Sequence, residues 1–162
     1  MDISSLLQSL KFADSVVNRN CEGISHEESL IHPEKQGQNF NWVLGHMVRT
    51  RNDILGILGK KPLFEESKFS VYTPKGFVPE KAVNVKELQN CFNALQRELQ
   101  NGIESLTPEK LQQPASVVPN RPDTVGSVLG TILWHEAYHA GQLGIIRRTV
   151  GQPGVIKNPA GE

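Results

Sequence analysis

The sequence predicts an all-α protein, a four-helix bundle with a long crossover between helices two and three. Apolar residues recur at three- and four-residue intervals over four long stretches, which is the pattern of helices that bury one face. Strand-like sequence is confined to two short segments, 69–72 and 116–118. The 162 residues, 38% of them hydrophobic, suit one domain over residues 1–162 with a single core.

The first two helices are expected over about residues 2–21 and 41–58. A glycine follows each stretch, and glycine often ends a helix because it adopts left-handed backbone angles. Asn39 or Asn41 would cap the start of the second helix, since an asparagine side chain accepts a hydrogen bond from the free N–H groups there.

The last two helices are expected over about residues 84–105 and 123–150. Asn84 is a suitable N-cap for the third helix, and Asp123 or Thr124 for the fourth. After the third helix, a threonine, a proline and a glutamate in succession predict one short helical turn.

The connection over residues 61–83 carries three prolines and four aromatic residues. Long loops in compact domains are uncommon and are often functional, as lids or binding walls. Two interpretations stay open. The segment either only covers one end of the bundle, or it forms a substrate wall from Phe69, Tyr72 and Phe77.

His135 and His139 are four residues apart on the fourth expected helix. At this spacing two side chains differ by about 40° around the axis and about 6 Å along it, so both imidazoles can bind one metal ion. The face around them is largely apolar, and His46 lies in the middle of the second helix. Burying three imidazoles without partners is costly. We therefore expect His46, His135 and His139 to be the ligands of one divalent transition metal.

Three protein ligands leave at least one coordination position open, as in catalytic zinc sites. Residues 135–139 also match the protease motif HExxH, in which Glu136 would be the general base. That class is disfavoured, because its third ligand usually lies downstream, whereas His46 lies upstream. Glu136 remains the candidate catalytic acid or base, with a surface or ion-pair role as the alternative.

Two segments resemble the DinB/YfiT-like superfamily, whose members are described as metalloenzymes. They are Asn-Trp-Val-Leu-Gly-His-Met over residues 41–47 and Trp-His-Glu-Ala-Tyr-His-Ala-Gly-Gln-Leu over residues 134–143. The resemblance extends from the first helix to Val150. It implies a four-helix bundle, a metal held by His46, His135 and His139, often nickel or zinc, and frequent dimers. It also implies relatives that include thiol-dependent transferases and isomerases.

Composition limits the partners. Lys plus Arg and Asp plus Glu both number 17, so the formal net charge is zero. This balance favours neither nucleic acid nor an anionic membrane, and no apolar run is long enough to span a membrane. The first fifteen residues lack the apolar core of a secretory signal. Cys21 and Cys91 are isolated in sequence, so we expect reduced thiols and a cytoplasmic location.

Small residues gather on the side of the fourth helix opposite the histidines. Each glycine costs up to about 1 kcal/mol relative to alanine in a helix, so close approach by another element is expected. A second subunit, giving a homodimer, is the preferred interpretation. The alternative is cover by the first helix or the long connection. The residues are Gly126, Gly130, Ala137, Ala140, Gly141 and Gly144.

The leading functional hypothesis is a metal-dependent hydrolase or thiol-dependent transferase that acts on a small-molecule substrate. A metal-stabilised, stress-linked binding protein without catalytic activity is the alternative. An acid or base beside the open metal position would distinguish the two.

Overall fold

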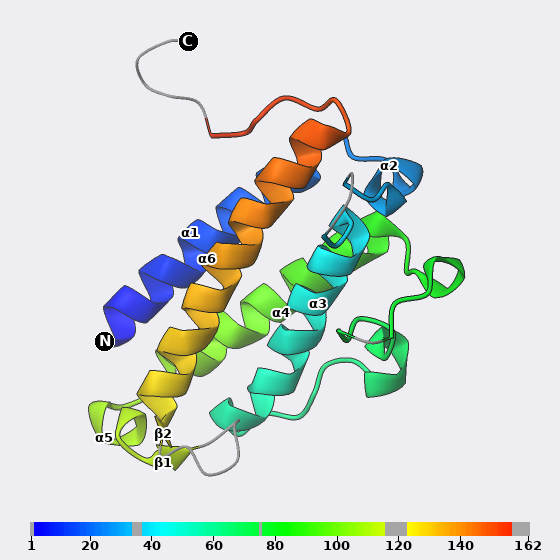
Figure 1. The fold of residues 1–162 in the computed structure, drawn as a ribbon. Coiled ribbons are helices and arrows are strands. Elements are labelled where there is room, and N and C mark those ends of the chain that lie inside the picture. The colour runs from blue at the N-terminus through cyan, green and yellow to red at the C-terminus, as the bar shows by residue number, and fades with distance from the viewer. Residues whose placement is uncertain (1, 34–36, 75, 116–122, 157–162) are drawn as a thin grey trace.

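The computed structural model describes residues 2–33, 37–74, 76–115 and 123–156, and its architecture is all-α, as predicted (Figure 1). Four long helices form the bundle. Each matches an expected stretch to within a few residues, the second continuing as a short 3₁₀ turn, so local apolar periodicity is a sufficient guide to the main elements. The four are α1 (Ile3–Cys21), α3 (Phe40–Ile54), α4 (Val85–Glu104) and α6 (Val125–Thr149).

Short elements connect these helices. The segment expected as a strand at 69–72 instead contains the end of a 3₁₀ turn, and residues 116–118 lie outside the described part of the chain. Two two-residue strands pair antiparallel, Pro114 opposite Thr124 and Ala115 opposite Asp123. The short elements are α2 (His26–Leu30), η1 (Leu55–Leu58), η2 (Glu66–Phe69), η3 (Pro79–Lys81), α5 (Pro108–Leu111), β1 (Pro114–Ala115) and β2 (Asp123–Thr124).

Side-chain caps fix the helix starts. Asn39, rather than Asn41, caps α3 by accepting a hydrogen bond of 2.8 Å from the backbone N–H of Trp42. Thr124 caps α6 by accepting from the N–H of Ser127 at 3.2 Å. Such caps satisfy N–H groups that have no partner within the helix.

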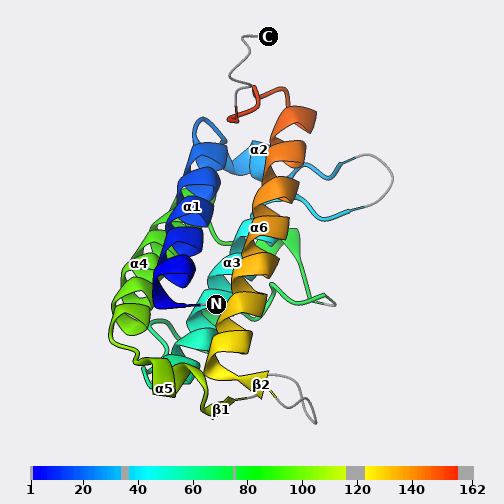
Figure 2. The same ribbon diagram turned by 90° about the vertical axis from the view of Figure 1, so that its left-hand side faces the viewer.

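The helices pack in a closed order, with α1 between α4 and α6, and α3 between the same two helices on the other side (Figure 2). Their inward faces form one cluster of buried apolar side chains. α3 and α6 therefore lie against each other, and this contact brings residues 46 and 135–139 together.

The connection between α3 and α4 is fixed firmly to α3. The buried Tyr72 hydroxyl donates to Asn41 Oδ1 at 2.9 Å and accepts from the N–H of Val83 at 2.8 Å. Asn52 Oδ1 accepts from two backbone N–H groups, those of Leu63 and Phe64. Phe69 and Tyr72 are core residues, 1% and 0% exposed. Their side chains therefore complete the bundle instead of lining a substrate pocket.

The small-residue face of α6 is divided among several neighbours. Asn20 of α1 donates to the carbonyl of Ala140 at 3.2 Å, and its side chain covers Gly144. Leu111 of α5 covers Gly126, whereas Gly141 faces open space. The alternative of cover within one chain is thus correct for part of this face, and the part around Gly141 stays open.

Candidate metal centre

The His46 side chain, on α3, is oriented by one contact to the face of its ring and one contact to its Nδ1 atom. Trp42, one turn earlier, stacks on the imidazole with ring centroids 4.9 Å apart and planes within 5°. The Nδ1 atom lies 3.4 Å from the backbone carbonyl oxygen of Tyr72. Tyr72 comes this close because residue 45 is glycine, where a Cβ would lie 2.3 Å from the tyrosine ring. The long connection therefore orients His46 through its backbone.

His135 and His139 project from successive turns of α6 toward His46. The Nε2 atoms of His135 and His139 are 2.9 Å apart, and those of His46 and His135 are 3.1 Å apart. All three residues offer a ring nitrogen within 4.8 Å of the others. The expected group of His46, His135 and His139 is thus brought together at one point.

Outer hydrogen bonds select the nitrogen that two of the three rings, His46 and His139, offer. His139 Nδ1 lies 2.6 Å from Gln142 Oε1, and Gln142 Nε2 in turn donates to the Tyr138 hydroxyl at 3.1 Å. An amide or backbone oxygen only accepts, so His139 and His46 carry their proton on Nδ1 and leave an Nε2 lone pair free. A hydrogen bond from the second ring nitrogen is the usual way in which proteins orient histidine ligands.

The donor set fits a divalent transition metal. Ligand nitrogens about 2.0–2.1 Å from a tetrahedral Zn²⁺ are roughly 3.3 Å from one another, close to the two short Nε2 separations here. The Nε2 lone pairs of His46 and His139 both face the Nε2 atom of His135. Neutral imidazoles suit zinc, nickel or other late transition metals better than magnesium or calcium. The three histidines can therefore hold one metal ion.

Burial keeps these imidazoles neutral. Desolvation, followed by the neighbouring His139 and His135, lowers the pKa of His46 to about 4. Desolvation also lowers the pKa values of His135 and His139 below the ordinary value of about 6.5. At neutral pH all three rings are uncharged, which is the state that binds a metal.

The Glu136 carboxylate does not face the histidines. It is 1% exposed in the bundle core, where its Oε1 accepts from Arg51 Nε at 2.6 Å and its Oε2 accepts from Arg51 Nη2 at 2.9 Å. The ion-pair alternative thus describes this side chain. A role for Glu136 as acid or base remains a prediction.

Sequence reasoning missed Arg51, although a signal for it exists. Arg51 falls one turn beyond Met47 and two turns beyond Leu44 in an apolar stripe of α3. Glu136 falls at the same kind of position on α6, one turn beyond Leu133. Opposite charges in two buried stripes predict a buried ion pair, because a lone buried charge is very unfavourable.

Arg49, in contrast, pairs with Asp53 one turn later on the same helix, at 3.8 Å. His32 lies 3.3 Å from Asn39, and the described residues place neither His26 nor His32 in the histidine group.

Fold and site together define a helical bundle with a group of three histidines, between two of its helices, that could hold a metal ion. The sequence model of the DinB superfamily matches residues 10–143, so the chain belongs to the DinB superfamily. A solved structure described as a conserved protein from Enterococcus faecalis has a similar fold, with a TM-score of 0.73 and 19% identity over 93% of this chain and 98% of that one. No curated protein matches the chain. In the described residues no helix is long and apolar enough to cross a membrane.

Proposed function

We propose that this protein is a metal-dependent enzyme that acts on a small molecule, of the hydrolase or thiol-dependent transferase type. The observation that carries the proposal is the convergence of three ring nitrogens. Tyr72 orients the outer nitrogen of His46, and Gln142 orients that of His139. Nickel and zinc are the preferred metals, because neutral nitrogen donors suit late transition ions. When bound, such a metal supplies Lewis-acid catalysis at neutral pH.

The chain's own residues prepare the site for this role. His46, His135 and His139 would bind the metal, and three ligands leave a position open for substrate. Trp42 and Tyr138 place aromatic rings against His46 and His139, and these rings would bound the position beside the metal.

A peptidase is a poorer match. The carboxylate that would be its base, Glu136, has both oxygens engaged by Arg51. The described strands are two residues long, which is too short to bind an extended peptide as an added strand. The same engagement of Glu136 favours the alternative of a non-catalytic metal-binding protein, because Arg51 holds both oxygens of the acid or base that the sequence offered.

Metal loading and activity separate these functions. The purified chain should bind one zinc or nickel ion, and His135→Ala should not. A panel of thiol and ester substrates should then show turnover by the wild-type protein that is lost in His135→Ala. Metal binding with no difference in turnover between the two proteins would favour the non-catalytic alternative.

We also place the protein in the cytoplasm, since Cys21 and Cys91 are buried and unpaired with each other.

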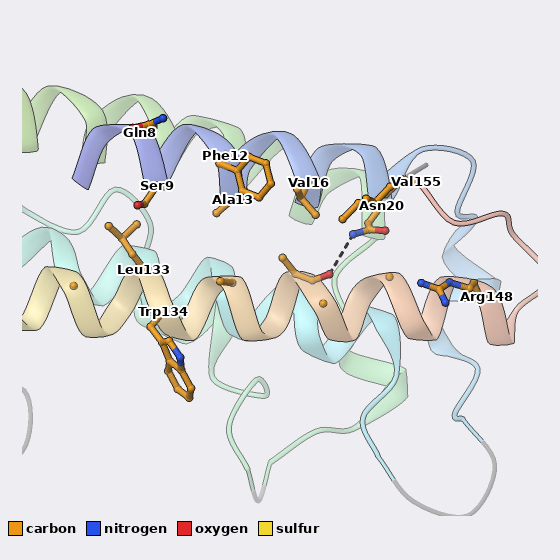
Figure 3. Close-up of a pocket in the computed structure, with 16 residues that line it drawn as sticks. Gln8, Ser9, Phe12, Ala13, Val16, Asn20, Leu133, Trp134, Arg148 and Val155 are labelled. Atoms are coloured by element: carbon orange, nitrogen blue, oxygen red, sulfur yellow. Dashed lines mark hydrogen bonds between the residues drawn. The ribbon is translucent and has the colours of Figure 1, made fainter. Parts of the chain in front are cut away.

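We further propose a homodimer that forms through the α1–α6 face. A groove with a volume of about 650 Å³ lies between these helices (Figure 3). The small residues of α6 that line it are Gly130, Ala137, Ala140, Gly141 and Gly144. Large apolar side chains project from the same face, led by Trp134 at 70% exposed and Phe12 at 66%. A two-fold interface uses the same patch of surface on both subunits. That patch therefore needs both projecting side chains and a groove that receives them.

The exposed area supports a second copy as the occupant. Aromatic side chains present roughly 200 Å² each, so the exposed parts of Phe12 and Trp134 offer roughly 270 Å² per copy. Two copies would bury roughly 500 Å² from these two residues, about half of the ~1,000 Å² of specific interfaces, and the remaining lining of the groove would supply the rest. Light scattering at micromolar concentration should give twice the chain mass, and Phe12→Glu should halve it. A monomeric wild-type mass would contradict the dimer.

A further inference from the structure

The buried Arg51 contacts all four long helices of the bundle. It extends from α3 and is itself 0% exposed. Its guanidinium bonds Glu136 of α6 through two nitrogens, donates to the carbonyl of Phe92 in α4 at 3.3 Å, and lies 3.8 Å from Asp14 of α1. The guanidinium carbon also sits 3.6 Å above the centroid of the Phe92 ring. One side chain therefore links α3 to the other three long helices.

Such a pair fixes geometry more than it adds stability. Removing two charges from water largely offsets their attraction, so apolar residues of similar volume often serve stability equally well. A bidentate arginine–carboxylate bond, however, holds its partners at fixed distance and orientation. The pair of Arg51 and Glu136 joins the same two helices, α3 and α6, as the contact of His46 with His135.

The position of the pair in sequence couples it to the metal ligands. Glu136 directly follows His135, so any shift of α6 at residue 136 moves His135 by nearly the same amount. Metal sites tolerate errors of about 0.2 Å in ligand distance, and an apolar contact permits larger sliding. Among the histidines, the polar contact between α3 and α6 is the pair of Nε2 atoms of His46 and His135, 3.1 Å apart.

We propose that the Arg51–Glu136 pair is a positioning device for the metal centre. It fixes the separation and register of α3 and α6, so that His46 meets His135 and His139 at metal-binding distance before the metal arrives. The inference rests on the proposed metal binding and assigns Glu136 a positioning role in place of acid–base chemistry.

Three proteins test this role beside the wild type. Glu136→Gln replaces one acceptor oxygen by an N–H donor that faces the guanidinium. The double variant Arg51→Met with Glu136→Leu replaces the pair by apolar groups of similar size. Lys60→Met is the matched control, because it removes another ion pair of 2.8 Å, with Glu98, outside the core. For each protein we would measure the Tm without metal, and the Zn²⁺ and Ni²⁺ affinities by competition with a chromophoric chelator, at a temperature where all are folded.

Glu136→Gln should lower the metal-free Tm by about 10 °C, since it breaks a buried pair. It should also weaken metal binding about tenfold, which is the size of effect measured when a group that orients metal ligands is lost. The double variant should recover most of the Tm but keep the weakened affinity. The Co²⁺-loaded double variant should also show an altered visible absorption spectrum, which reports ligand geometry. Lys60→Met should bind metal as the wild type does.

The outcomes separate the two proposals. If the double variant regains both the Tm and the wild-type affinity, the pair is a stability element only, and the positioning role is wrong. The same conclusion follows if Glu136→Gln loses Tm but keeps its affinity. If the wild type binds neither Zn²⁺ nor Ni²⁺, the proposed function itself fails, and this inference fails with it.

Discussion

Gly45 is the point at which the long connection and the metal centre meet, and Gly45→Ala tests that junction. A Cβ at this position would lie 2.3 Å from Cδ1 and Cε1 of Tyr72. Carbon atoms in contact are about 3.5–4.0 Å apart, so the ring would have to retreat by more than about 1 Å. Tyr72 is fully buried and bonded through its hydroxyl, so it has no free space to enter.

The expected loss of stability follows from these contacts. Overpacking costs about 1–3 kcal/mol, and weakening the two hydrogen bonds of the Tyr72 hydroxyl costs about 1 kcal/mol each. Alanine in a helix returns about 1 kcal/mol relative to glycine. The net loss is about 2–4 kcal/mol, which corresponds to a Tm lower by roughly 4–16 °C for a chain of this length.

Metal affinity should fall as well, because Tyr72 carries the carbonyl that orients His46. A loss of about tenfold is expected for a disturbed outer-shell partner. Thermal unfolding followed by circular dichroism gives the Tm, and competition with a chelator gives the metal affinity. Gly56→Ala is the control, since a Cβ there meets nothing within 4 Å. If Gly45→Ala matches the wild type in both Tm and affinity, the Tyr72 contact does not have the role assigned to it.

Three further predictions concern the contacts that hold the long connection and the properties of the three-histidine group. Asn52→Ala should lower stability by about 2–3 kcal/mol, because it leaves the N–H groups of Leu63 and Phe64 without their acceptor, and urea unfolding measures the loss. Gln142→Leu should weaken metal binding about tenfold while changing Tm little, since it removes the acceptor for His139 Nδ1; unchanged affinity would contradict the orienting role. The metal-free protein should lose stability as the pH falls from about 6.5 to about 4. In that range the unfolded chain binds protons at His46 that the folded chain, with its lowered pKa, does not. The loss of Tm on acidification should be smaller in His46→Gln, and an equal loss in both proteins would contradict this cause.

The sequence predicts the parts of this molecule that local patterns encode. Helix bounds follow from apolar periodicity and from capping residues such as Asn39 and Thr124. The histidine pair on α6 follows from four-residue spacing, and His46 follows because it is the remaining histidine in the middle of a helix. Each of these inferences rests on the pattern of residues within a single helix.

The parts that the sequence did not predict depend on how separate helices meet. Arg51 and Glu136 lie 85 residues apart, and although each falls in the apolar stripe of its own helix, their pairing becomes evident only when the two helices are placed face to face. The Tyr72 carbonyl is a backbone group, which no residue type identifies. The hollow around Gly141 stays open because α1 covers only the Ala140 and Gly144 side of the small-residue face.

The most direct test of the account is the metal content of the purified chain after reconstitution with zinc and with nickel and removal of the excess. Three oriented, neutral imidazoles should hold about one metal ion per chain. His46→Ala, His135→Ala and His139→Ala should each retain less than about 0.2. A wild-type chain with less than about 0.2 metal, or variants that bind as much as the wild type, would contradict the metal centre on which the account rests.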